Sequence, residues 1–334
     1  MATVQKIKAI GLLSGGLDST LAVKLLQDQG IEVIALTFTS PFCLCNQKGK
    51  CYSAETAKKL GIASKVIPKG EKYLKLLRNP KHGYGSAMNP CIDCRIFILK
   101  EAKSFAKKTG AKFLFTGEVL GQRPMSQHFQ ALKKIEKEAG LEGKLLRPLS
   151  AKLLAPTEAE EKKWVDRNKL LCLQGRTRKP QFELAKKFGI NDFPCPSGGC
   201  LLTYKEFAAK IRDLFKNKKT VSLKDIAILK IGRHFRIGKN KIIVGRNKEE
   251  NAQLLGLKQK NEIAFEVPNT GSPVAILQGK KTKSTLQAAA QLTLRYSDCR
   301  QEKAEVEYWA LPSKKKKIIV KQVSEKEIEK LRIQ

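Results

Sequence analysis

The stretch that decides the fold is Ser14-Gly15-Gly16-Leu17-Asp18-Ser19, near the start of the chain. It lies between an apolar run, residues 7–13, and a helical pattern over residues 17–29. This order predicts a strand, a glycine-rich turn and a helix. Adjacent glycines let the backbone approach an anion closely, and a helix start offers free N–H groups to a phosphate. The stretch therefore predicts a phosphate-binding turn, with an ordinary tight turn as the alternative.

The side chains of this turn suit a bound nucleotide. Ser14 and Ser19 add hydroxyl donors, and Asp18 is placed either to cap the helix or to help hold Mg²⁺. The spacing matches neither the GxxxxGK(S/T) phosphate loop nor the GxGxxG fingerprint. Lys24 also lies too far into the helix to serve as the lysine of the former.

The first half of the chain alternates apolar runs with helical patterns. Strands are expected over residues 7–13, 31–38, 63–67 and 112–116, and helices over residues 17–29, 53–60 and 93–108. This alternation predicts an α/β domain with a doubly wound parallel sheet. Ligands of such sheets bind at the carboxyl ends of the strands, where the glycine turn lies.

The charge of the chain indicates a polyanionic partner. Its 65 Lys and Arg residues outnumber 31 Asp and Glu residues, which gives a net charge of +34. Neutralising phosphates releases counterions, so RNA is the expected partner, and a generally lysine-rich composition is the alternative. No apolar run is long enough to span a membrane, and the N-terminus leads directly into the first strand. We therefore expect a cytoplasmic protein that does not bind a membrane.

The length of 334 residues predicts two domains, and the composition changes near residue 204. We expect an α/β domain over 1–204 and a smaller, basic α+β domain over 205–334. The second domain should begin with a helix, residues 205–215, followed by short strands. The strand candidates are IAILKIG (226–232), HFRIG (234–238), KIIVG (241–245), EIAFEVP (262–268) and PVAILQG (273–279). Gly238-Lys239-Asn240 predicts a hairpin turn.

The nine cysteines indicate a metal or catalytic role, because a cytoplasmic protein rarely carries a disulfide framework. Cys91 and Cys94 form a C-x2-C pair where a helix begins, a place that favours thiolates. Cys195 and Cys200 lie in a Pro/Gly-rich loop. Two thiols of the pair with one of the loop would hold a [4Fe-4S] cluster that leaves one iron open. Using both loop thiols would instead close a four-thiolate zinc site, and a redox dithiol is a further alternative.

The remaining cysteines carry weaker signals. Cys43, Cys45 and Cys51 follow the second strand, but their C-x-C-x5-C spacing is not a standard zinc spacing, and we expect an auxiliary or incidental role. Cys172 and Cys299 stand alone and are expected to be ordinary buried thiols.

The hexapeptide SGGLDS resembles the signature of the PP-loop ATP pyrophosphatases, which cleave ATP between the α and β phosphates. Together with the cysteine pattern it resembles the PP-loop tRNA thiouridine synthetases. This resemblance implies that Cys91, Cys94 and Cys200 ligate a [4Fe-4S] cluster, with Cys195 as the alternative third ligand. The stretches NPCIDC (89–94), TGEVLGQRPMSQ (116–127), LLRPLSAKLL (145–154) and PSGGCLLT (196–203) are similar to a bacterial ThiI-like subgroup.

Two further features belong to the resemblance. Where the wider family often has Gly-His after the fourth strand, this chain has Gly117-Glu118. The segment IGRHFRIGKNKIIVGRNKEENAQL (231–254) resembles the R domain of the NFACT proteins, which implies RNA binding. The RNA-binding candidates are Arg233, Arg236 and Arg246 of this segment, with Arg178 of the basic stretch GRTRKPQ (175–181).

The sequence thus predicts an ATP-dependent tRNA sulfurtransferase that adenylates a uridine carbonyl and replaces its oxygen with sulfur. Asp18, Cys91, Cys94 and Cys200 are the predicted catalytic residues. The predicted ATP-binding residues are Ser14, Gly15, Gly16, Asp18, Ser19, Thr37, Phe38, Thr39 and Gly117. The expected partners are tRNA, a sulfur donor and a second copy of the chain. A dimer would present a longer basic surface to tRNA. The alternatives are a PP-loop ligase or amidating enzyme with zinc, and a non-catalytic RNA-binding factor.

Overall fold

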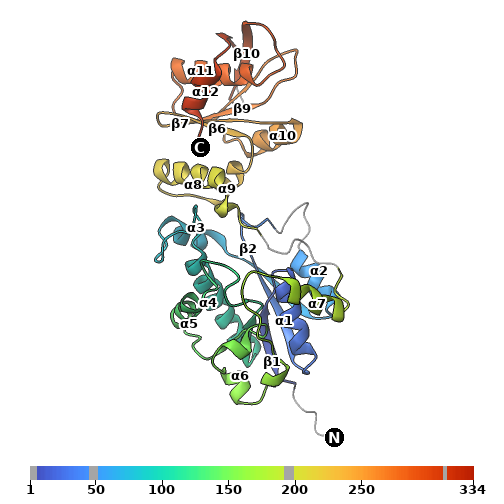
Figure 1. The fold of residues 1–334 in the computed structure, drawn as a ribbon. Helices are drawn as coiled ribbons and strands as arrows, with labels where there is room; N and C mark the ends of the chain where they lie inside the picture. Colours follow the sequence, from blue (N-terminus) through green and yellow to red (C-terminus); the bar gives the residue numbers. More distant parts are fainter. Residues whose placement is uncertain (1–5, 45–51, 192–198, 311–313) are drawn as a thin grey trace. The chain divides into compact units, whose positions relative to one another are not determined.

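The computed structural model describes residues 6–44, 52–191, 199–310 and 314–334. The chain divides into two compact units, residues 1–203 and residues 204–334, and each is described by itself (Figure 1).

The first unit is built on a five-stranded parallel sheet with the strand order β3-β2-β1-β4-β5. Its strands are β1 (Lys8–Leu12), β2 (Glu32–Thr39), β3 (Ala63–Pro68), β4 (Phe113–Thr116) and β5 (Leu145–Leu146). The predicted doubly wound parallel sheet is therefore confirmed. The strand order reverses between β1 and β4, and such a switch point is where ligands of open α/β sheets bind.

Helices cover both faces of this sheet (Figure 1). On one side lie α1 (Leu17–Gln27), α2 (Tyr52–Lys59) and α7 (Lys179–Lys187), and on the other lie α4 (Cys91–Thr109) and α5 (Phe129–Ala139). The remaining helical segments are α3 (Gly70–Arg78), α6 (Glu158–Glu161) and the short 3-10 turns Ala151–Leu153, Arg167–Lys169 and Leu201–Thr203. Two apolar layers form as a result.

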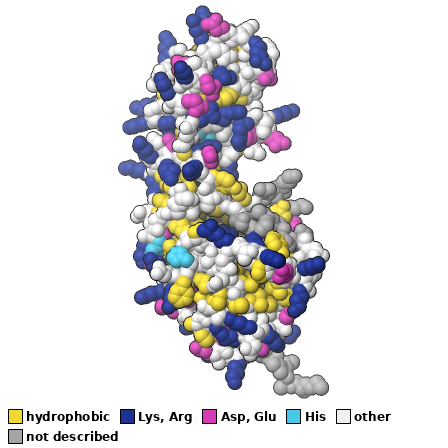
Figure 2. Space-filling view, in the orientation of Figure 1, with side chains coloured by type: hydrophobic (Ala, Val, Ile, Leu, Met, Phe, Trp, Pro, Cys, Tyr) yellow, Lys and Arg dark blue, Asp and Glu magenta, His cyan; other side chains and the backbone are white. Residues whose placement is uncertain are grey.

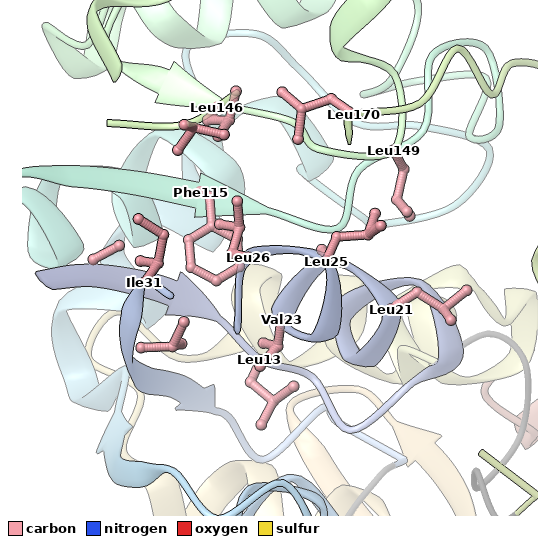
Figure 3. Packing of buried hydrophobic residues seen from close by; sticks show 14 of the residues in the cluster. Leu13, Leu21, Val23, Leu25, Leu26, Ile31, Phe115, Leu146, Leu149 and Leu170 are labelled. Atoms are coloured by element: carbon pink, nitrogen blue, oxygen red, sulfur yellow. The ribbon is translucent and has the colours of Figure 1, made fainter. Parts of the chain in front are cut away.

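Successive side chains of β1 contribute in turn to the two apolar layers. Ala9 belongs to the core beneath α1, and Ile10 belongs to the core beneath α4. Successive side chains of a strand point to opposite faces, so a strand buried on both faces must be apolar throughout. In the first layer Leu21, Leu25 and Leu26 of α1 belong to one apolar cluster with Phe115 of β4, and Figure 3 shows Leu26 beside the Phe115 ring. This packing fixes the start of α1, where the glycine-rich turn lies.

The second unit is built on a six-stranded antiparallel sheet with the order β11-β10-β8-β9-β7-β6. Its strands are β6 (Arg233–Ile237), β7 (Asn240–Val244), β8 (Ile263–Glu266), β9 (Ala275–Gln278), β10 (Lys303–Trp309) and β11 (Lys316–Lys321). Its helices are α8 (Lys205–Asn217), α9 (Leu223–Leu229), α10 (Lys248–Leu257), α11 (Lys283–Arg295) and α12 (Glu325–Leu331). Apolar clusters lie on both faces of the sheet. The predicted hairpin turn at Gly238-Lys239 is confirmed, because Ile237 pairs with Asn240.

One strand prediction in this unit is wrong. Residues 226–232 were expected to form a strand, but most of them lie in α9. Ser222 begins this helix with a capping box, in which its hydroxyl accepts from the Asp225 N–H and the Asp225 carboxylate accepts from the Ser222 N–H. This cap satisfies backbone donors that a strand would place in a sheet, so the apolar residues of the segment form a helix face.

Within the described ranges, no helix combines the length and the apolar character needed to cross a membrane.

Candidate active site at the carboxyl edge of the parallel sheet

The turn after β1 is held in shape by its own hydroxyl groups. The Ser14 and Ser19 Oγ atoms lie 3.2 Å apart, and the Ser19 hydroxyl donates to the Gly16 carbonyl at 2.9 Å. Gly15 has a φ of +78°, and a Cβ there would lie 2.9 Å from the Ser53 backbone nitrogen. Only glycine fits this position, because the left-handed conformation and the close backbone both exclude a side chain.

The turn is closed from the other side by the segment that follows β4. A Cβ on Gly117 would lie 2.5 Å from the Ser19 backbone nitrogen and 2.6 Å from the Asp18 carbonyl carbon. The predicted site residue Gly117 therefore lies against the start of α1, across the switch point of the sheet.

The predicted adenosine-pocket residues lie at the end of β2. Thr37 is buried, and its hydroxyl donates to the Leu13 carbonyl at 2.7 Å, so this side chain holds β2 against the end of β1. Phe38 is partly buried against the α4 layer. The Thr39 carbonyl accepts from the Lys69 N–H at 2.9 Å, which leads the chain into α3. These contacts place the three residues beside the glycine turn. The Thr37 hydroxyl proton is already donated to the Leu13 carbonyl.

Asp18 receives hydrogen bonds from two distant segments. Its Oδ2 atom accepts from Gln122 Nε2 at 2.8 Å and from Arg178 Nη2 at 2.7 Å. Arg178 was expected among exposed RNA-binding arginines, but its side chain is only 16% exposed and forms an ion pair with Asp18. The structure thus places Arg178 at the glycine turn, while its neighbour Arg176 remains exposed.

Glu118, which follows Gly117 after β4, is the centre of a buried ionic group. Its carboxylate is 3.3 Å from Arg95 Nε and 3.1 Å from Arg147 Nε. Burial alone would raise the pKa of Glu118, but the two guanidinium groups and the Thr116 hydroxyl lower it below its ordinary value. Arg147 also pairs with Glu136. Glu118 therefore ties Arg95 and Arg147 together at the edge of the sheet.

Two of the predicted thiols begin α4, and a third lies beside the segment after β2. Cys91 is the first residue of α4, and Cys94 lies in its first turn. Cys200 pairs with Cys43 in an antiparallel bridge, and burial together with Cys94 and Cys43 raises the pKa of the Cys200 thiol to about 12. Cys45, Cys51 and the alternative ligand Cys195 lie outside the described residues.

Lys69 and Tyr73 connect these thiols, and the sequence did not indicate them. Lys69 is buried, its Nζ atom donates to Cys94 Sγ at 3.0 Å, and the same ammonium lies 4.5 Å from the centre of the Tyr73 ring. Burial, then the neighbouring Cys94, raises the pKa of Tyr73 well above its usual value, and Cys200 and Cys91 act in the same direction. The only signal in the sequence is the position of Lys69, directly after a strand.

Cysteine thiols are the donors that iron–sulfur clusters and structural zinc prefer. Cys91 and Cys94 lie one helical turn apart at the start of α4, and with Cys200 they offer three thiols, so the donor set fits such a group by its chemistry. In the part of the chain that the structure describes, no three His, Cys, Asp or Glu side chains converge on one metal position.

The isolated cysteines differ from expectation. Cys172 was expected to be buried, but it is exposed, and Cys299 is half-buried. The irregular stretch around Cys172 leaves it at the surface, because the packing residues are its neighbours Leu170, Leu171 and Leu173.

The three arginine candidates of the second unit all have partners within that unit. Arg233 stacks on Tyr296 at 4.5 Å, Arg236 donates through Nε to Asp213 at 2.8 Å, and Arg246 donates to Glu250 at 2.9 Å. Arg246 nevertheless has half of its side chain exposed. Figure 2 shows Lys and Arg side chains over the visible surface of each unit, with fewer acidic ones between them.

The fold and the site define the class of this protein. A glycine-rich SGGLDS turn at the switch point of a parallel sheet, with serine hydroxyls and Asp18 around it, is the arrangement of a PP-loop nucleotide-binding domain. Residues 4–152 match the family model described as thiamine biosynthesis protein (ThiI), and residues 232–332 match the model described as the NFACT protein RNA binding domain. The chain therefore carries a domain that matches the ThiI family model, with the PP-loop arrangement, and a second domain that matches the NFACT RNA-binding model.

Curated relatives resemble the first unit. A probable tRNA sulfurtransferase of Thermococcus kodakarensis is 30% identical over 122 residues, which are 34% of this chain and 30% of that protein. A tRNA-specific 2-thiouridylase of Pelobacter propionicus is 32% identical over 114 residues, 31% of each chain. The chain spans about a third of the length of these relatives. A solved U34-tRNA thiolase from Methanococcus maripaludis with its [4Fe-4S] cluster is similar at 18% identity and a TM-score of 0.35, over 67% of this chain and 70% of that one.

Proposed function

We propose that this protein is an ATP-dependent tRNA sulfurtransferase. The observation that carries the proposal is the SGGLDS turn at the switch point of the parallel sheet, where Asp18 accepts from Gln122 at 2.8 Å and from Arg178 at 2.7 Å. The Cys91–Cys94 pair begins α4 of the same unit, so one unit holds both the nucleotide turn and the thiols that such a reaction uses. The matched relatives include a probable tRNA sulfurtransferase and a 2-thiouridylase, which supports the same reaction class.

The nucleotide side of the reaction rests on the turn after β1. The backbone of Gly15 and Gly16 with the hydroxyls of Ser14 and Ser19 would bind the pyrophosphate of ATP, and Asp18 would assist through Mg²⁺. The residues at the end of β2 and Gly117 would border the nucleotide.

The reaction replaces a carbon–oxygen bond of uridine by a carbon–sulfur bond, and neither the carbon nor the sulfur changes its oxidation state. The uridine carbonyl oxygen attacks the α phosphate of ATP and pyrophosphate leaves, which gives an adenylated base. A sulfide-level sulfur donor then attacks the carbon of the base that carries the adenylated oxygen. The C–O bond breaks, and AMP leaves with that oxygen. Adenylation is required because the carbonyl oxygen alone is a poor leaving group.

The thiols serve the sulfur side of the reaction. Cys91, Cys94 and Cys200 would hold a [4Fe-4S] cluster, with Cys195 as the alternative third ligand and zinc as the alternative metal. When bound by three thiolates, such a cluster supplies one open iron for a sulfur ligand. Lys69 donates to Cys94 and helps to orient it. The tRNA is the partner that the net charge of +34 and the NFACT-type domain support.

The test compares Cys91→Ser with Cys172→Ser, which removes an exposed thiol far from any proposed role. After anaerobic purification we expect about four irons per chain in the wild-type protein and in Cys172→Ser, and loss of iron in Cys91→Ser. Mass spectrometry of tRNA nucleosides should show thiolation by the first two proteins only. Retained thiolation by Cys91→Ser without iron would contradict the role of the cluster, and zinc without iron would favour a zinc-dependent ligase.

A further inference from the structure

The ion pair between Asp18 and Arg178 leaves one polar atom of each partner unused. Asp18 Oδ2 accepts two hydrogen bonds, whereas Asp18 Oδ1 and Arg178 Nη1 are buried without a hydrogen-bond partner among the described residues. Buried polar atoms without partners are few in native proteins, and each one points to a missing water, ion or ligand. Here an unused acceptor and an unused donor lie together at the glycine turn.

We propose that Arg178 is an ATP-binding residue: its Nη1 donates to a phosphate oxygen of the nucleotide while Nη2 remains on Asp18. This inference rests on the proposed ATP site and adds a residue to it. A guanidinium suits this double role because its N–H groups form a rigid fork that can hold two oxygen acceptors at once. The free Oδ1 of Asp18 remains available to the Mg²⁺ that accompanies ATP.

Arg178 lies beside Asp18 in the fold, although the two residues are 160 positions apart in the sequence. Arg178 is the N-cap residue of α7, a helix that lies beside α1 on the same face of the sheet (Figure 1). Gln181, in the first turn of α7, donates to Gln122 at 3.3 Å, and Gln122 in turn donates to Asp18. Two connected contacts therefore fix the start of α7 against the turn.

The surrounding charge also favours a polyphosphate. Burial, then the nearby Arg95, lowers the pKa of Arg123, and Arg178 acts in the same direction, while Cys91 and Asp18 oppose the shift. Guanidinium groups that repel one another at the edge of a site are stabilised by a bound anion. Because Arg95 is paired with Glu118, the two guanidinium groups of Arg123 and Arg178 with the one carboxylate of Asp18 leave positive charge for the phosphates of ATP.

The low exposure of Arg178 distinguishes this role from RNA binding. Its side chain is 16% exposed, whereas Arg176, two residues earlier in the same basic stretch, is exposed. A tRNA backbone would reach Arg176 more readily than Arg178. The two arginines therefore form a matched pair in which one is proposed to bind ATP and the other serves as the control.

The experiment measures binding of α,β-methylene-ATP and of adenosine to the full chain by titration calorimetry, with Mg²⁺ present. Arg178→Ala should weaken binding of the ATP analogue by roughly 10- to 100-fold, the effect of losing one hydrogen bond to a charged group. Arg178→Lys should retain part of the affinity. Adenosine has no phosphates, so its affinity should stay within twofold, and Arg176→Ala should change neither value.

The outcomes separate this inference from the proposed function. Binding of the analogue by Arg178→Ala within twofold of wild type would overturn the inference. An equal loss of adenosine affinity would also overturn it, because the residue would then only maintain the structure. A wild-type chain that binds neither compound would instead contradict the proposed ATP-dependent function itself.

Discussion

At the scale of single residues, Glu118 is the carboxylate on which a buried ionic group depends. Its side chain is 3% exposed and pairs with Arg95 and Arg147. A buried carboxylate between two arginines compensates charges that would otherwise be costly to bury. The residue therefore stabilises the edge of the sheet on which Gly117 and the thiols depend.

We expect Glu118→Gln to reduce the free energy of unfolding by about 3–5 kcal/mol at pH 7, because it removes the buried carboxylate that pairs with both Arg147 and Arg95. The lowered pKa of Glu118 means that the stabilisation is present above the pKa of the unfolded carboxyl and is lost as the pH falls through the folded pKa. Urea unfolding from pH 7 to pH 3 should show the difference between the two proteins shrinking at the acidic end.

The control for this prediction is Glu142→Gln, an exposed carboxylate, which should change stability by no more than about 0.5 kcal/mol. A difference between wild type and Glu118→Gln that stays constant over the whole pH range would show that Glu118 is not ionised in the folded protein.

The residues of the site differ in how far the sequence could predict them. The SGGLDS turn and the Cys91–Cys94 pair were predicted, because each is a local pattern with its own structural signal. The contact between Asp18 and Arg178 spans 160 positions and depends on the packing of α7 beside α1, so no local pattern reveals it. Lys69 was missed for a similar reason, since its burial follows from the approach of α3 and α4.

At the scale of elements, local signals decided most of the fold. The strands β1 to β4 were predicted because each lies in a largely apolar run that alternates with helical patterns, whereas β5 was not predicted because it has only two residues, Leu145 and Leu146. The segment 226–232 was misjudged because its apolar run was weighed without the Ser222 capping box before it. The antiparallel pair β10 and β11 was not predicted, since many of its side chains are exposed and charged.

The approach of β4 to α1 leads to a second prediction. A Cβ at Gly117 would meet backbone atoms of Asp18 and Ser19 at 2.5–2.6 Å, and backbone atoms cannot move aside as a side chain can. We expect Gly117→Ala to displace the start of α1, to lower stability by about 1–3 kcal/mol and to abolish binding of α,β-methylene-ATP. Chemical unfolding and titration calorimetry measure the two effects.

Gly256, in α10 of the second unit, is the matched control. A Cβ there meets nothing within 4 Å, so Gly256→Ala should stabilise the chain by about 0.5–1 kcal/mol and leave nucleotide binding unchanged. Normal affinity in Gly117→Ala would contradict the close packing of the β4 end on the glycine turn.

At the scale of the whole molecule, two units with different sheets share one excess of positive charge. The residues up to 204 carry a net charge of +18 and the residues from 205 onward carry +16. Both units therefore carry a large positive charge, which a polyanionic partner that contacts both of them would neutralise. We therefore assign the nucleotide and thiol chemistry to the first unit and propose tRNA as the partner of both.

The most direct test of this account is the reaction itself. The purified full chain, after anaerobic reconstitution with iron and sulfide, is incubated with unmodified tRNA, Mg²⁺, ATP and sulfide, and the digested nucleosides are analysed by mass spectrometry. We predict a thiolated uridine that forms only with ATP, accompanied by equal amounts of AMP and pyrophosphate. Formation of thiolated uridine without ATP, or release of AMP and pyrophosphate with no sulfur in the tRNA, would contradict the account.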